Sequence, residues 1–124
     1  MPSILFAPFS SAMTAPSLSD SDYQRLSGEA LARIEATVDR WLQADVLDID
    51  AQRSGGLLEM SLPNGSKLIV NTQPPLQELW LASRGGGFHF RYVDGAWRDT
   101  RDGAEFFSRL SEAASLQSGQ PLTF

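Results

Sequence analysis

Apolar residues recur at helical spacing in a long segment near the start of the chain, from Ser19 to about Ala44. The stripe comprises Tyr23, Leu26, Ala30, Leu31, Ile34, Val38, Trp41 and Leu42. This spacing predicts an amphipathic helix that buries one face. Ser19, with Asp22 three residues later, is typical of a helix start because the hydroxyl accepts a hydrogen bond from a backbone N–H of the first turn.

A second region, between residues 48 and 99, alternates apolar and polar residues, which predicts half-buried strands. The predicted strands cover 48–52, 58–62, 67–73, 78–82, 88–92 and 96–99. Glycine and proline mark the turns between them, most clearly at Asn64-Gly65 and Pro74-Pro75. After the last strand, Asp102 and Glu105 resemble a capping box that opens a second helix. Its apolar stripe ends near Gly119 and comprises Phe106, Phe107, Leu110, Ala113 and Ala114.

This order of elements predicts an α/β fold of the α+β type. We expect a two-layer sandwich, in which a meander sheet of about five to six antiparallel strands is covered on one face by an N-terminal and a C-terminal helix. The other face of the sheet is expected to be open to solvent.

One large aromatic residue is predicted on that open face. Leu79 and Leu81 are expected to face the core, so Trp80 between them points away from it. Asn71 and Gln73 of the neighbouring strand lie on the same outward face. An exposed tryptophan between amides is typical of a contact surface. The alternative, equally compatible with the pattern, is that a helix or the N-terminal leader covers Trp80.

Residues 1–18 contain no charged side chain, so they lack the basic segment of a secretory signal and the arginines of a transit peptide. We expect them to form a flexible leader ahead of one domain at 19–124. No apolar run approaches the ~20 residues needed to span a bilayer, so we expect a cytoplasmic protein with no membrane partner.

The composition excludes several classes of site. The chain has no cysteine, which excludes disulfides, thiolate nucleophiles and metal ligation by sulfur. A single histidine, His89, excludes a multi-histidine metal site within one chain. The net charge of −5 argues against nucleic-acid binding. No catalytic triad spacing and no phosphate-binding glycine loop is recognisable, so we do not expect an enzyme.

The negative charge is concentrated in one part of the chain. Between Asp20 and Asp50 there are eight acidic residues and three arginines, a difference of −5 that equals the net charge of the whole chain. Two placements are unfavourable. Glu35 and Asp39 are like charges four residues apart on a helix, and Asp45 lies at the negative end of the helix dipole.

Several short segments share their order and spacing with one known family. They are Asn64-Gly65-Ser66-Lys67, Asn71-Thr72-Gln73-Pro74-Pro75-Leu76, Leu79-Trp80-Leu81-Ala82, Gly86-Gly87-Phe88-His89-Phe90, and Trp97 with Asp102-Gly103. Together with the acidic first helix, they make residues 19–124 resemble the frataxin family in its bacterial, CyaY-type form.

The resemblance implies weak surface binding of iron, as Fe²⁺ or Fe³⁺, and work with the iron–sulfur cluster assembly machinery. The implied roles are iron donor and modulator of the complex between the cysteine desulfurase and the iron–sulfur scaffold protein. The implied metal residues are Glu35, Asp39, Asp48 and Asp50, with Asp22, Glu29 and Asp45 nearby. The implied partner surface is Asn71, Gln73 and Trp80. A monomer is expected without metal, and an iron-dependent oligomer stays open.

Two other interpretations of the acidic residues stay open. They are often simply the solvated face of a helix, or they form a docking surface for a basic patch on a partner, with iron binding incidental. The two unfavourable placements and the resemblance favour metal. His89 alternates with Phe88 and Phe90, so we expect it on the open face, as a satisfied structural histidine that supports this surface rather than an iron ligand. The ferroxidase activity credited to some frataxins is not expected here.

Overall fold

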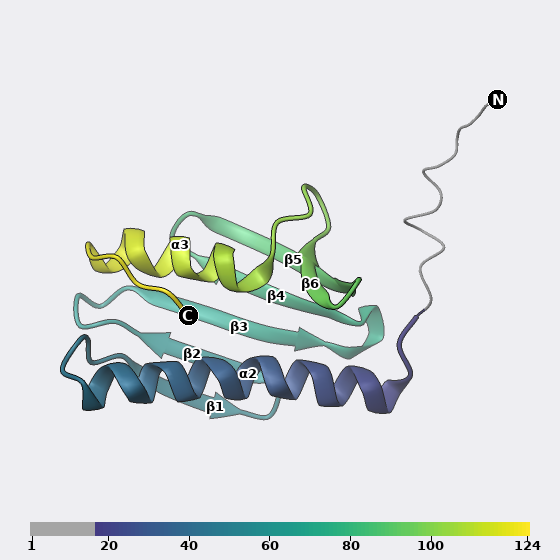
Figure 1. Cartoon of the computed structure of the whole chain (residues 1–124), viewed down its shortest axis with the longest axis horizontal. Coiled ribbons are helices and arrows are strands. Elements are labelled where there is room, and N and C mark those ends of the chain that lie inside the picture. Colours follow the sequence, from purple (N-terminus) through teal and green to yellow (C-terminus); the bar gives the residue numbers. More distant parts are fainter. Residues whose placement is uncertain (1–16) are drawn as a thin grey trace.

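The structure is a computed structural model that describes residues 17–124 (Figure 1). The chain forms a long helix, α2 (Asp20–Gln43), then six strands, and then a shorter helix, α3 (Phe106–Ser118). The strands are β1 (Asp50–Ser54), β2 (Leu57–Ser61), β3 (Lys67–Gln73), β4 (Glu78–Ser83), β5 (Gly86–Val93) and β6 (Ala96–Asp99). A short 3₁₀ helix, η2 (Pro74–Leu76), joins β3 to β4.

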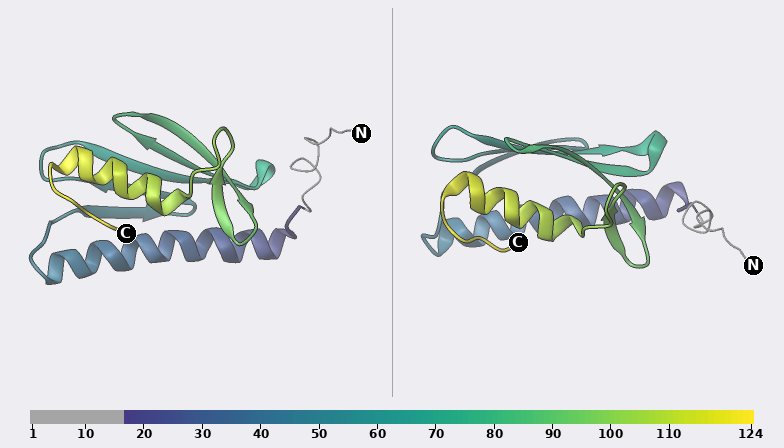
Figure 2. Two further views of the ribbon diagram at one scale, coloured as in Figure 1. Left: turned by 45° about the horizontal axis from the view of Figure 1, so that its top comes forward. Right: turned by 90° about the horizontal axis from the view of Figure 1, so that it is seen from above.

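The strands form one antiparallel meander in the order β1-β2-β3-β4-β5-β6. Both helices lie on the same side of this sheet, as the view from above shows (Figure 2, right). The two-layer α+β sandwich predicted from the sequence is therefore confirmed. Neither helix of residues 17–124 is long and apolar enough to cross a membrane.

The core lies between the sheet and the two helices. Its large and fully buried side chains are Tyr23, Leu31, Ile34, Leu58, Met60, Leu68, Val70, Leu79, Leu81, Phe90, Phe106 and Leu110. The predicted stripe of α2 is confirmed except at its last member, because Leu42 is 51% exposed. Leu42 lies in the last turn of α2, where it lines a groove beside β1 instead of the core.

The two helix starts differ in how well they were predicted. Ser19 is the N-cap of α2, and its hydroxyl accepts a hydrogen bond from the Asp22 backbone N–H, as predicted. The predicted capping box before α3 is wrong. Glu105 is itself the N-cap, and its side chain accepts hydrogen bonds from the N–H groups of Phe107 and Ser108. Asp102 instead accepts from the Ala104 N–H, and this bond together with Arg109 lowers the pKa of Asp102. The helix therefore begins later than the pattern predicted.

The first strand is shifted by two residues from its predicted position, 48–52, to Asp50–Ser54. Its partner β2 ends at Ser61, because the Leu62 N–H bonds to the Ser66 carbonyl across the next turn. Residues 48 and 49 are thus left without a partner strand, while the strand continues up to the tight turn at Gly55 and Gly56.

A buried tyrosine ties the start of α2 to the sheet. The Tyr23 hydroxyl donates to the Glu78 carbonyl (2.6 Å) and accepts from the Gln73 N–H (3.0 Å). The two backbone groups lie on either side of η2, where Pro74 and the left-handed Gln77 (φ 53°) interrupt the ladder between β3 and β4. Burial of the phenol raises its pKa, against an opposing effect of the Gln73 N–H.

The predicted leader, residues 1–18, lies almost entirely outside the described residues, so its flexibility stays a prediction. Its last residue is held in place, because the Leu18 N–H donates to the Gln77 side chain (3.1 Å) and the Leu18 carbonyl accepts from it (2.6 Å).

We expect Tyr23→Phe to lower the free energy of unfolding by about 1–3 kcal/mol at pH 7, because the Gln73 N–H and the Glu78 carbonyl, both partly buried, lose the hydroxyl as a hydrogen-bond partner. Since the folded-state pKa of Tyr23 is raised, the neutral phenol's contribution is complete below the ordinary pKa of 10.0 and is lost as pH rises through the folded-state value. Urea unfolding at pH 7 and at higher pH measures both effects.

Tyr92→Phe is the matched control, because the Tyr92 hydroxyl makes no hydrogen bond to any residue in 17–124. Equal stability of the two variants at pH 7 would contradict the role given to Tyr23.

Candidate metal-binding and partner-binding surfaces

The seven acidic residues predicted to bind metal all reach solvent. Glu35 is half-buried and the other six are exposed. They form three groups on the surface, two along α2 and one that extends from the loop after α2 to the start of β1. Within residues 17–124, no three His, Asp or Glu side chains come close enough together to hold one metal ion. The structure therefore does not bring the predicted residues into a single preformed cage.

The first group, Asp22 and Glu29, lies in the N-terminal half of α2. Arg25 pairs with both, at 3.5 Å from Asp22 and 3.6 Å from Glu29. Helix geometry places Glu29 about 9 Å along the axis from Glu35 and roughly 120° around it. This group is thus separated from the other predicted metal residues of the helix.

The second group, Glu35 and Asp39, lines a groove between α2 and the edge strand β1. Leu42, Ile49 and Ala51 also line this groove, whose volume is about 530 Å³. Carboxylates four residues apart lie on the same side of a helix, with Cβ atoms about 5–6 Å apart. Glu35 is paired with Arg53 of β1 at 2.7 Å. Among residues 17–124, the Asp39 carboxylate accepts a hydrogen bond only from the Gln43 amide, at 3.2 Å.

The third group comprises Asp45 and the two aspartates around Ile49. Asp45 adopts a left-handed conformation (φ 58°) just after α2, and backbone bonds to the Leu42 and Trp41 carbonyls close the helix around it. Asp48 and Asp50 are exposed on either side of buried Ile49, which agrees with their predicted placement on one face.

That face is not the one that lines the groove. In β1, Ala51 and Arg53 face the helices, since they are opposite buried Met60 and Leu58 in the register, and Ile49 just before the strand is buried on the same side. Asp50 is opposite Ser61 and therefore lies on the open side of the sheet. Because β1 is an edge strand, the two sides are separated only by the strand itself.

The predicted partner residues lie together on the open face of the sheet. Asn71 is directly opposite Trp80 in the ladder between β3 and β4, and Trp80 is directly opposite His89 of β5. Gln73 is opposite Glu78 on the same side. Asn71, Gln73 and Trp80 are all half-buried.

Neither of the two long helices of residues 17–124 covers this face, because α2 and α3 are both on the other side (Figure 2). The suggestion that a helix covers Trp80 is therefore wrong, whereas a covering role for the leader concerns residues outside the described part of the chain. Trp80 instead packs against its neighbours on the sheet.

Two residues hold Trp80 in place: His89, which the sequence predicted on this face, and Glu78, which was not assigned to the partner surface. His89 stacks on the Trp80 ring with centroids 4.2 Å apart and planes 8° from parallel. Glu78 accepts a hydrogen bond from the indole N–H at 2.8 Å, and lies 3.8 Å from Nδ1 of His89. The period of two in β4 places Glu78 beside Trp80 and was the available signal. This arrangement fixes the orientation of the indole ring on the open face of the sheet.

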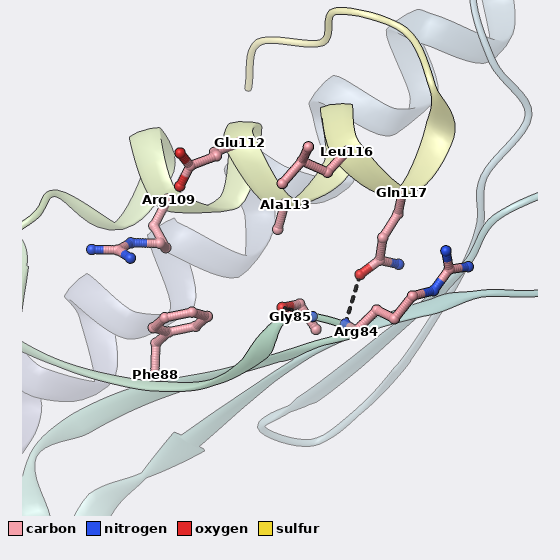
Figure 3. Close-up of a pocket in the computed structure, with 9 residues that line it drawn as sticks. Arg84, Gly85, Phe88, Arg109, Glu112, Ala113, Leu116 and Gln117 are labelled. Carbon is pink, nitrogen blue, oxygen red and sulfur yellow. Dashed lines mark hydrogen bonds between the residues drawn. The ribbon is translucent and has the colours of Figure 1, made fainter.

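A further cleft lies between α3 and the turn that joins β4 to β5 (Figure 3). Phe88 and Ala113 line it, and Leu116 on its rim is 79% exposed. Buried Gln117 accepts a hydrogen bond from the Arg84 N–H at 2.8 Å, which fixes the turn to the helix. Arg109 stacks over Phe88 at 4.8 Å. It also pairs with Asp102 (2.8 Å) and lies 3.8 Å from buried Asp99. This cleft includes none of the residues that the sequence predicted to bind metal or a partner.

Comparisons with known proteins agree with this architecture. A family model described as a frataxin-like domain matches residues 16–120. An iron-sulfur cluster assembly protein CyaY from Variovorax paradoxus strain S110 is 55% identical over 107 residues, which cover 86% of this chain and 97% of that protein. A CyaY-family frataxin structure from Psychromonas ingrahamii has 34% identity and a TM-score of 0.76, over 86% of this chain and 97% of that one.

A more distant structure shares the fold alone. It is a trimeric frataxin from the yeast Saccharomyces cerevisiae, complexed with ferrous iron, at 21% identity and a TM-score of 0.56, over 92% of this chain and all of that one. The family match and the bacterial relatives agree with the resemblance found in the sequence, and the chain belongs to the frataxin family in its bacterial, CyaY-type form.

Proposed function

We propose that this chain takes part in iron–sulfur cluster assembly in the cytoplasm, as a binding protein rather than an enzyme. It binds iron weakly at its acidic surface and delivers it to a scaffold protein. The observation that supports this most directly is the 55% identity to a relative, named as an iron-sulfur cluster assembly protein, over nearly that relative's whole length. The yeast frataxin structure complexed with ferrous iron has the same fold.

The donor set on this surface suits iron as a cargo. Carboxylate oxygens are hard ligands that bind Fe²⁺ and Fe³⁺ without sulfur or imidazole. Glu35 and Asp39 form the principal contact in this proposal, because a cation between them relieves the repulsion of two like charges on one helix face. Asp45, Asp48 and Asp50 extend the surface around the edge strand, and Asp22 and Glu29 form a secondary position on α2.

Weak binding follows from the spread of these carboxylates. An ion at this surface keeps most of its water ligands, so it exchanges readily and is poorly selected against other divalent ions. Such lability suits a donor, which must release its metal to the next protein.

The partners in this proposal are the cysteine desulfurase and the iron–sulfur scaffold protein. The proposed partner contact is Asn71, Gln73 and Trp80 on the open sheet face. Its central aromatic ring is held in place by stacking on His89. The free protein is proposed to be a monomer without metal. An iron-dependent oligomer is a further possibility, since the yeast frataxin complexed with ferrous iron is described as trimeric.

A second candidate function uses the same acidic surface without metal. In it, the negative face of α2 and β1 docks on a basic patch of the desulfurase and regulates that enzyme, and iron binding is incidental. The concentration of the net charge in residues 20–50 favours this possibility as well. The two candidates differ in whether partner binding requires iron.

The iron site is tested by a pair of matched double variants in an anaerobic Fe²⁺ titration followed by amide NMR. Glu35→Gln with Asp39→Asn should abolish the response of the C-terminal half of α2, because it removes the proposed principal ligands. Asp22→Asn with Glu29→Gln removes the same two residue types from the other end of the helix and should leave that response intact. Equal losses in the two variants would show a diffuse effect of charge and would contradict a localised site.

The partner surface is tested by Trp80→Ala, with affinity for the scaffold and for the desulfurase measured by calorimetry. We expect a loss of about 2 kcal/mol or more for the partner that contacts this face, roughly a thirty-fold weakening, as for other central aromatic anchors. Leu116→Ala is the control, because Leu116 is an exposed apolar residue on α3, which lies on the other side of the sheet. If Trp80→Ala binds both partners like the wild type, the open face is not the contact.

A further inference from the structure

One ion pair joins α2 to β1, the two elements that flank the groove of the proposed iron contact. Nη1 of Arg53 lies 2.7 Å from Oε1 of Glu35, and the two side chains are 35% and 37% exposed. The pair joins the edge strand to the middle of α2, because Arg53 continues the helix-facing row of Ile49 and Ala51. This contact is shorter than the two pairs that Arg25 makes on the same helix, and its side chains are less exposed than theirs.

The ion pair with Arg53 engages the Glu35 carboxylate, which is one of the two ligands of the proposed iron site. Within residues 17–124, Arg53 is the basic residue that pairs with Glu35, and Asp39 forms no ion pair. A cation that binds between Glu35 and Asp39 must therefore compete with a guanidinium already in contact with one of its two ligands. The net free energy of cation binding at Glu35 is therefore smaller by the interaction that Glu35 loses with Arg53.

We propose that Arg53 is a built-in competitor for iron at Glu35, which lowers the affinity of this chain for Fe²⁺ and keeps the bound ion exchangeable. The inference rests on the proposed function, since it concerns the same carboxylates. When iron leaves, Arg53 returns to Glu35, so that release does not expose an unpaired carboxylate beside Asp39. Arg53 is on β1 and Glu35 is on α2, so the packing of these two elements keeps the competing guanidinium beside the carboxylate.

The test is the dissociation constant for Fe²⁺ of the full chain and of Arg53→Gln, measured anaerobically by amide NMR at fixed ionic strength. We expect Arg53→Gln to bind Fe²⁺ about two- to five-fold more tightly, the range that corresponds to a partly exposed ion pair. The gain should appear at the residues around Glu35 and Asp39. The variant is expected to remain folded, because it changes one surface pair.

Arg40→Gln is the matched control. Arg40 follows Asp39 on α2 and donates only to the Thr37 hydroxyl (3.3 Å), with no ion pair among the described residues. It removes the same charge without freeing Glu35, so we expect a smaller gain in affinity than for Arg53→Gln. An equal gain in both variants would assign the effect to net charge and would overturn the role given to Arg53.

The remaining outcomes separate the two levels of the proposal. A localised iron response in the wild type with an unchanged affinity in Arg53→Gln overturns the competition and leaves the proposed function intact. No localised response in either protein overturns the iron site itself, and the competition with it.

Discussion

An antiparallel sheet of six strands needs one of its faces removed from water, and in this chain α2 and α3 together cover that face. The buried side chains of β2, β3, β4 and β5 alternate with residues that must point the other way. The burial of Leu79 and Leu81 therefore obliges Trp80 to lie on the open face, in line with Asn71 and His89. The partner surface that we propose is thus a consequence of how the core is built.

The same packing determines where the negative charge is placed. The apolar stripe of α2 faces the sheet, so its carboxylates project from the outer and lateral sides of the helix. Glu35 and Asp39 meet the edge strand, while Asp22 and Glu29 are held by Arg25 further along. In our proposal, these separate groups of carboxylates are weak positions for an exchangeable cation.

Much of the fold was predictable from the sequence because it depends on short-range patterns. The helical stripe from Tyr23 to Trp41, the alternation in β2 to β5, and the turn at Asn64-Gly65 all specify their structures locally. The capping box at Asp102 was wrong because two carboxylates within one turn compete for the role of N-cap, and only the geometry of the loop decides between them. The predicted start of β1 was wrong because the true start depends on where the partner strand β2 ends.

The candidate site was predictable only as a set of residues. The sequence indicates which carboxylates are outward, but their grouping depends on how far apart the helix places them and on which side of β1 each one lies. The pair between Glu35 and Arg53 joins residues 18 positions apart on two different elements, so no local spacing could indicate it. The stacking of His89 on Trp80 likewise depends on the register of β4 and β5.

The central claim is that iron binds to the acidic surface of the free protein at a defined place. The most direct measurement is an anaerobic Fe²⁺ titration of the wild-type chain followed by amide NMR, with Mg²⁺ in a parallel titration. We expect broadening confined to the C-terminal half of α2 and residues 45–50, at lower concentrations of Fe²⁺ than of Mg²⁺. A response spread evenly over all acidic residues, or the same response to Mg²⁺, would contradict the claim and leave the acidic surface as a docking site for a partner.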